Sequence, residues 1–152
     1  MNTAFDKMVF EMPRLLLKLR QTEPVGRDNL RGVPQHGVYV LYEDGNPIYV
    51  GRSNRLKARL LEHSRQGSTH YGATLAFNLA KENAAKEGID ISRNRSQLEK
   101  DRIFKDMFTQ AKNRVYQMKI RTIQVDDPVV QTLFEVYAAL ALKTKYNDFD
   151  TH

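Results

Sequence analysis

Two arginines and a histidine recur at intervals of four residues in the segment 52–65. Arg55, Arg59 and His63 would lie on one face of a helix, because residues four apart are neighbours on a helix surface. A planar guanidinium can hold a phosphate through two hydrogen bonds, and a histidine can donate a hydrogen bond or transfer a proton. The row could therefore bind a phosphodiester backbone, or it could be a solvated face that only aids solubility.

The same segment is strongly basic as a whole. It also carries Arg52, Lys57 and Arg65, against a single acid, Glu62. The segment directly follows a strand-like run, a position from which its cations could hold the backbone of a nucleic acid. We predict Arg52, Arg55 and Lys57 as contacts of this kind.

Two strand-like runs, 37–42 and 47–51, precede the basic segment, and they include Tyr39 and Tyr49. The turn between them contains Asp44-Gly45, which is typical of a β-hairpin. A two-residue turn would pair Tyr39 with Val50 and place the two tyrosines on opposite faces. A three-residue loop would pair Tyr39 with Tyr49 on one face, and the glycine favours it. Routine cross-strand packing is the alternative to a chemical role.

One carboxylate stands apart from other charges on a late helical segment, 128–144. The main apolar face of this helix would hold Val129, Val130, Leu133, Phe134, Tyr137, Leu140 and Ala141. Glu135 lies opposite that face. Its neighbours three and four residues away are uncharged, namely Gln131, Thr132, Ala138 and Ala139. The small neighbours predict a second covered face or a cleft, so Glu135 is a candidate ligand for a hard cation such as Mg²⁺. An ordinary exposed glutamate is the alternative.

The elements that must position these residues follow from the spacing of apolar side chains. Helices are predicted over 5–20, 73–87, 96–112 and 128–144, besides a basic helix that begins after Ser53 or Asn54. Strands are predicted over 37–42, 47–51 and 116–125, with loops at 22–36 and 65–72. This order predicts an α+β domain with a small, mainly antiparallel three-stranded sheet flanked by helices.

The composition is that of one compact domain with a basic surface. The chain has 152 residues, of which 41% are hydrophobic and 28% charged. Its net charge of +6 favours a polyanionic partner. The absence of cysteine excludes disulfides and thiolate metal sites and suits the cytoplasm, where we expect the protein. No apolar run approaches the roughly 18 residues of a membrane span, so we expect no membrane partner.

Together these residues resemble the GIY-YIG nuclease family. Gly37-Val38-Tyr39 and Tyr49-Val50-Gly51 match the two motifs that name the family, each with valine for isoleucine. The further matches, in the family's order, are Arg59, His63, Glu135 and Asn147. The resemblance covers residues 36–148. It implies a nuclease domain at 37–148, preceded by an N-terminal helix and connecting loop at 1–36.

A helical insertion at about 65–114 lengthens the stretch between His63 and Glu135 relative to simpler members. It is either a substrate-specificity insertion or helical scaffolding with a solvated basic surface. Competitors of Glu135 for the metal are Glu82, Glu87 and Glu99, of which Glu99 is better interpreted as a surface ion pair beside Lys100 and Arg102. His70 could match a second histidine found in some members.

The resemblance implies a metal-dependent endonuclease that hydrolyses DNA phosphodiester bonds. Glu135 would hold one Mg²⁺ or Mn²⁺ ion, which would offset charge on the phosphate. Tyr39 would orient or deprotonate the attacking water, with help from the metal or His63, because a tyrosine of pKa ~10 is a poor base. Tyr49 and Arg59 would fix the phosphate, and Asn147 would support the site or hold substrate.

Two other functions fit the same residues. A non-catalytic nucleic-acid-binding module could keep the fold, and a protein-interaction domain could use the basic surface against an acidic partner. For a nuclease, the DNA could be branched or a specific duplex site. The oligomeric state is left open.

Overall fold

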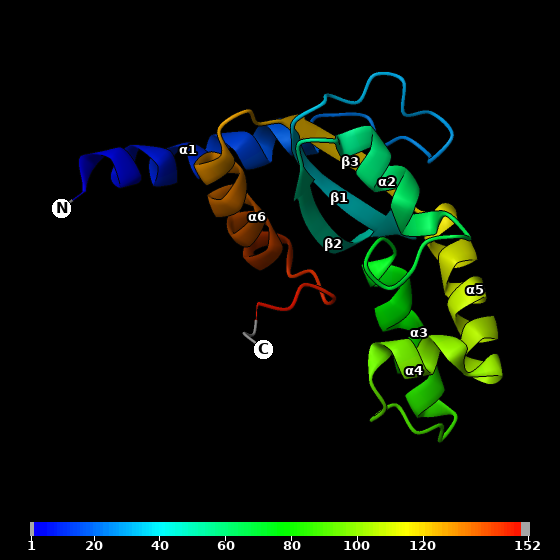
Figure 1. The fold of residues 1–152 in the computed structure, drawn as a ribbon. Coiled ribbons are helices and arrows are strands. Elements are labelled where there is room, and N and C mark those ends of the chain that lie inside the picture. Colours follow the sequence, from blue (N-terminus) through cyan, green and yellow to red (C-terminus); the bar gives the residue numbers. More distant parts are fainter. Residues whose placement is uncertain (1, 150–152) are drawn as a thin grey trace. The chain divides into compact units, whose positions relative to one another are not determined.

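The computed structural model describes residues 2–149 (Figure 1). The elements are α1 (Thr3–Arg20), β1 (Gly37–Glu43), β2 (Asn46–Ser53), α2 (Leu56–Ser64), α3 (Thr74–Lys86), α4 (Arg95–Lys100), α5 (Arg102–Tyr116), β3 (Lys119–Gln124) and α6 (Pro128–Leu142). The strands form one antiparallel sheet in the order β2-β1-β3. The predicted α+β class and three-stranded antiparallel sheet are therefore confirmed.

The chain divides into two compact units. The first comprises the described parts of Met1–Lys57 and Met118–His152, and the second comprises Ala58–Gln117. The sheet, α1 and α6 belong to the first unit, whereas α3, α4 and α5 belong to the second. Helix α2 begins in the first unit and continues in the second. The predicted insertion at about 65–114 lies within the second unit.

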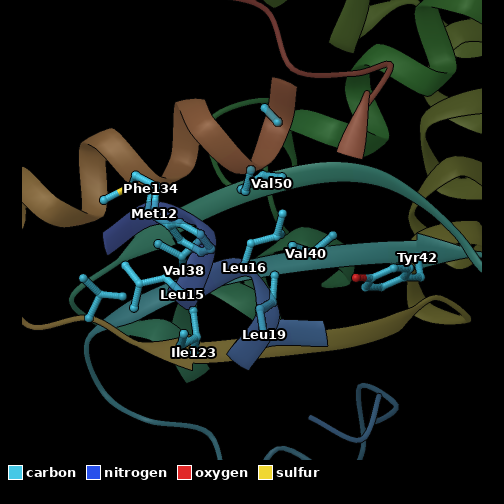
Figure 2. Close-up of a cluster of buried hydrophobic side chains, with 13 residues drawn as sticks. Met12, Leu15, Leu16, Leu19, Val38, Val40, Tyr42, Val50, Ile123 and Phe134 are labelled. Atoms are coloured by element: carbon cyan, nitrogen blue, oxygen red, sulfur yellow. The ribbon is translucent and has the colours of Figure 1, made fainter. Parts of the chain in front are cut away.

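The core of the first unit lies between one face of the sheet and helices α1 and α6 (Figure 2). Val38 and Val40 of β1, Val50 of β2 and Ile123 of β3 point to this side. From the helices come Met12, Leu15, Leu16, Leu19, Phe134, Ala138 and Ala139. Because side chains alternate along a strand, Tyr39 and Leu41 of β1 point to the opposite face.

The hairpin between β1 and β2 has a two-residue turn and a β-bulge. Asp44 and Gly45 both have positive φ, 52° and 81°, as a tight hairpin turn requires. The pairing then shifts between Leu41 and Tyr42, because Tyr42 pairs with Pro47 but Leu41 pairs with Tyr49. Ile48 is the extra residue. This extra residue shifts the register by one, so Tyr39 pairs with Gly51. It also moves the side chains of β2 beyond the bulge to the other face of the sheet.

Both predicted registers of this hairpin are wrong, because Tyr39 pairs neither with Val50 nor with Tyr49. The shared face is nevertheless correct. Tyr49 stands opposite Leu41, and Leu41 is on the same face of β1 as Tyr39. The bulge therefore achieves what a three-residue loop was expected to achieve.

Helix α6 begins at Pro128, as predicted, and Asp127 is its N-cap. The predicted main face is correct in part. Phe134 is buried, and Val130, Leu133 and Tyr137 are partly buried against the core, whereas Val129 and Leu140 are 53% and 70% exposed. The expected second face is also covered, because Gln131, Ala138 and Ala139 are buried.

The predicted helix 96–112 is two helices, α4 and α5, which meet at Asp101. The backbone of Asp101 is extended, and its carboxylate accepts hydrogen bonds from the amides of Ile103 and Phe104. Asp101 thereby caps a new helix. Phe104 packs edge-on against Phe77 of α3 at 5.2 Å, which joins α5 to α3 in the second unit. No helix within residues 2–149 has the length and apolar character needed to cross a membrane.

Replacement of Gly51 by alanine should destabilise the protein by about 1–3 kcal/mol, the usual effect of overpacking. A Cβ at position 51 would overlap the Tyr39 ring, whereas a Cβ at Gly32 would meet no atom within 4 Å. Urea denaturation of Gly51→Ala and of the control Gly32→Ala measures the difference. Equal stability of the two variants would contradict the pairing of Tyr39 with Gly51.

Candidate functional site

The two motif tyrosines contact each other on the face of the sheet opposite the α1–α6 core. Their ring centroids are 6.3 Å apart and the rings are tilted by 45°. Tyr39 is 1% exposed, and Tyr49 is half-buried. The Tyr39 ring occupies the space above Gly51 that a side chain would fill, so the second motif's glycine makes room for the first motif's tyrosine.

Asn147 holds the outer edge of β2. Its side-chain amide donates to the Val50 carbonyl and accepts from the Val50 amide, both at 2.8 Å. The Thr144 hydroxyl donates to the same Asn147 oxygen at 2.7 Å, and the Tyr146 amide donates to the Ile48 carbonyl at 3.2 Å. Asn147 therefore satisfies the backbone amide and carbonyl of Val50 on the edge strand, between Tyr49 and Gly51, as a supporting residue would.

Gln131 joins α6 to the end of β2. It is 0% exposed, and its side-chain nitrogen donates to the Val125 carbonyl at 2.6 Å and to Asn54 Oδ1 at 3.0 Å. Its side-chain oxygen accepts from Arg52 at 3.5 Å. The sequence reasoning named Gln131 only as a neighbour of Glu135. A polar residue on a face of alanines was the available signal for a buried hydrogen-bond network.

Glu135 lies one turn after Gln131 and is half-buried. Burial removes water from its carboxylate and raises its pKa, and the nearby positive charge of Arg52 opposes that shift. The helix itself supplies no cation, as expected, but β2 does. Because α6 packs on the Val38, Val40 and Val50 face, Glu135 comes from a helix on the side of the sheet opposite to the one that carries the tyrosine rings.

The predicted basic row is not a continuous helix face. Helix α2 begins at Leu56, so Arg55 precedes it, with its amide donating to the Ser53 hydroxyl at 2.9 Å. Arg52, Arg55 and Lys57 are exposed.

Arg59 and His63 belong to the second unit, where both are largely covered. Arg59 Nη1 donates to the Gly72 carbonyl at 2.7 Å and lies 3.4 Å from Glu62 Oε2. His63 is 1% exposed, and burial, followed by the Arg59 charge, lowers its pKa to about 3. A solvated face is therefore wrong for this pair. Any role of His63 near neutral pH starts from the uncharged imidazole.

Two further buried polar contacts hold the loop between α2 and α3. His70 Nδ1 lies 2.7 Å from Glu99 Oε1, so the interpretation of Glu99 as a surface ion pair beside Lys100 and Arg102 is wrong. Lys112 is 5% exposed, and its ammonium donates to the carbonyls of Gln66 and Ser68 at 2.8 and 2.6 Å. These contacts join residues 29 and more positions apart in sequence, which spacing alone does not reveal.

The part of the chain that the structure describes holds no group of three His, Asp or Glu side chains able to bind a metal ion by themselves. Scans against models of protein families and searches of curated proteins and of solved structures find no match. Geometry therefore defines separate groups of candidate residues in each unit. In the first unit Tyr39 contacts Tyr49, Asn147 binds β2, and Glu135 lies near Arg52. In the second unit Arg59 lies near His63.

His63 should remain uncharged from pH 8 down to pH 5. Its pKa of about 3 lies well below this range, so its imidazole proton resonances should not shift there in an NMR titration. In urea-unfolded protein the same resonances should titrate near ~6.5. The depressed pKa also means that the free energy of unfolding falls as pH is lowered from ~6.5 to about 3, because over this range only the unfolded chain takes up the proton. A native midpoint near 6.5 would contradict the burial.

Glu135→Gln should stabilise the protein at neutral pH. The pKa of Glu135 is raised in the folded state, so its contribution to stability is fully present only below the unfolded pKa and is lost as pH rises through the folded pKa. The gain in melting temperature should therefore disappear in acid. The exposed Glu87, changed to glutamine, is the control and should show no such gain. A lower melting temperature for Glu135→Gln at pH 7 would refute this.

Proposed function

We propose that the chain is a metal-dependent endonuclease of the GIY-YIG type, located in the cytoplasm, that hydrolyses DNA phosphodiester bonds. The observation that carries the proposal is the contact of Tyr39 with Tyr49 over Gly51. The bulge at Ile48 places Tyr49 on the face of Tyr39, and the glycine at position 51 leaves room for the Tyr39 ring, so the two phenols lie close together on one face.

In this proposal the phenols handle the attacking water and the phosphate. Tyr39 orients or deprotonates the water, and Tyr49, the more exposed of the two, donates to a phosphate oxygen. Since Tyr39 is 1% exposed, the groups that cover it must move when substrate binds. Asn147 acts as a positioning residue, because it fixes the backbone of Val50 beside Tyr49.

Glu135 is the proposed ligand of Mg²⁺ or Mn²⁺. An oxygen donor whose charge is poorly solvated suits a hard cation, and Mg²⁺ is commonly held by one or two carboxylates together with waters and substrate phosphates. Arg52 competes for the same carboxylate. Because Glu135 and the tyrosine rings lie on opposite sides of the sheet, the substrate would have to pass around the edge strand β2 for a bound ion to stabilise charge on the same phosphate as a Lewis acid.

Arg59 and His63 complete the proposed set of residues. Arg59 would stabilise negative charge on the phosphate in the transition state, and neutral His63 would accept or donate one hydrogen bond. Arg52, Arg55 and Lys57 would bind the DNA backbone, which predicts binding that weakens steeply with salt. A non-catalytic binding module would share that salt dependence, so only cleavage separates the two functions.

Wild-type protein should nick plasmid or branched DNA with Mg²⁺ or Mn²⁺, and EDTA should stop the reaction. Glu135→Gln should lose at least about a hundredfold in rate, the scale of a lost electrostatic stabiliser, yet bind DNA within a few-fold of wild type. The exposed Glu87→Gln should cleave normally.

Full activity of Glu135→Gln would remove the metal assignment. If wild-type protein binds DNA but cleaves neither DNA nor RNA with either ion, the non-catalytic module is the correct function. An absence of binding at any salt concentration would instead favour the protein-interaction domain.

A further inference from the structure

A buried lysine, Lys112, forms hydrogen bonds that hold the loop of residues 65–72 in the second unit. The Lys112 ammonium donates to the carbonyls of Gln66 and Ser68 and lies 4.0 Å from the centroid of the Phe108 ring. Burying an ammonium costs several kcal/mol unless such partners replace water. The loop supplies two of them, so Lys112 and the loop conformation depend on each other.

Two more contacts fix the far half of the loop. His70 is 6% exposed and bound to Glu99, and Arg59 donates to the carbonyl of Gly72. The loop is thus held near its start, at its middle and at its end. Rigid backbone of this kind lowers the entropic cost of binding a ligand.

The outer side of the same loop is open to solvent. Arg65, Thr69 and Tyr71 are exposed, and Tyr71 is 78% exposed although its ring lies 4.0 Å from that of His70. These side chains line an open cavity of about 500 Å³, together with Glu62, Gly67, Ser68 and Gly72. The volume is in the range of small-molecule sites. Tyr71 is therefore a fixed aromatic platform backed by a buried histidine.

The chemistry of this cavity suits one unpaired nucleotide. An aromatic ring stacks on the face of a base, and an arginine binds the adjoining phosphate. Glu62, the acid among the lining residues, would repel a phosphate but can accept from a base amino group, as carboxylates do with cytosine. In a duplex the base faces are covered by their neighbours, so only an unpaired base can stack.

We propose that the 65–72 loop binds an unpaired nucleotide, with its base stacked on Tyr71 and its phosphate on Arg65. The inference rests on the proposed nuclease function and narrows its substrate to DNA with unpaired bases, such as flaps or splayed ends. The loop then selects substrate by structure rather than by sequence.

The test compares Tyr71→Ala with Tyr71→Phe, and uses Phe10→Ala, which removes an 83% exposed ring from α1, as the control. Binding to a flap and to a fully paired duplex is measured by fluorescence anisotropy in EDTA, with 2-aminopurine in the flap. Tyr71→Ala should weaken flap binding on the order of tenfold or more and abolish the 2-aminopurine quenching. Duplex binding should stay unchanged. Tyr71→Phe and Phe10→Ala should behave as wild type.

Equal effects of Tyr71→Ala on flap and duplex, or no effect on either, would overturn the inference. Competition by polyglutamate as strong as that by single-stranded DNA would also overturn it, because the loop would then bind acidic proteins equally well. Cleavage is read separately with Mg²⁺. If the protein cleaves DNA but Tyr71→Ala binds the flap as wild type does, only the proposed role of the loop is refuted. If flap binding depends on Tyr71 but no cleavage occurs, only the proposed nuclease activity is refuted. Thermal melting confirms that the variants fold.

Discussion

The pairing of β1 with β2 is the constraint on which the rest of the first unit depends. The bulge at Ile48 sets Val40 opposite Val50, so both valines enter the core beneath α1 and α6. The same register sends Tyr39 and Tyr49 to the other face, with Gly51 beneath the Tyr39 ring. It also turns the amide and carbonyl of Val50 outward, where Asn147 binds both. A slip of one residue would exchange the two faces and lose all three arrangements.

Buried polar groups do the remaining positioning in both units. Gln131, one turn before Glu135, ties α6 to the end of β2 and accepts from Arg52, while Lys112 and His70 hold a loop whose outer surface is exposed. Such groups are costly to bury and stabilise only one arrangement of their partners. Glu135 itself is half-buried and its pKa is raised by burial, so the fold keeps a carboxylate where its charge is poorly solvated.

Residue spacing and turn residues predicted the helices and strands, whereas contacts between residues far apart in sequence determine how the candidate site residues are placed. The hairpin, the start of α6 at Pro128 and the three strands followed from spacing and turn residues. The bulge did not, because it depends on core valines and on Asn147, which is 97 residues from Val50. The face of α6 was predicted in part, because Phe134 is buried and Val130 and Leu133 pack on the core, but apolar spacing alone did not reveal that the alanines beside Gln131 are buried too. The break at Asp101 was readable from its capping carboxylate, whereas the Glu99–His70 contact had no local signal.

The register of β1 and β2 can be measured by cross-strand NOEs between assigned protons. The backbone amide and carbonyl of Val50 form hydrogen bonds with Asn147, so they do not bond to Val40. Val40 and Val50 are therefore a pair without mutual hydrogen bonds, in which the two Hα protons lie close together. The bulged register predicts a strong Hα–Hα NOE between Val40 and Val50, together with NOEs between the rings of Tyr39 and Tyr49. An Hα–Hα NOE between Val40 and Tyr49, without any contact between the rings, would contradict the shared tyrosine face and the site built on it.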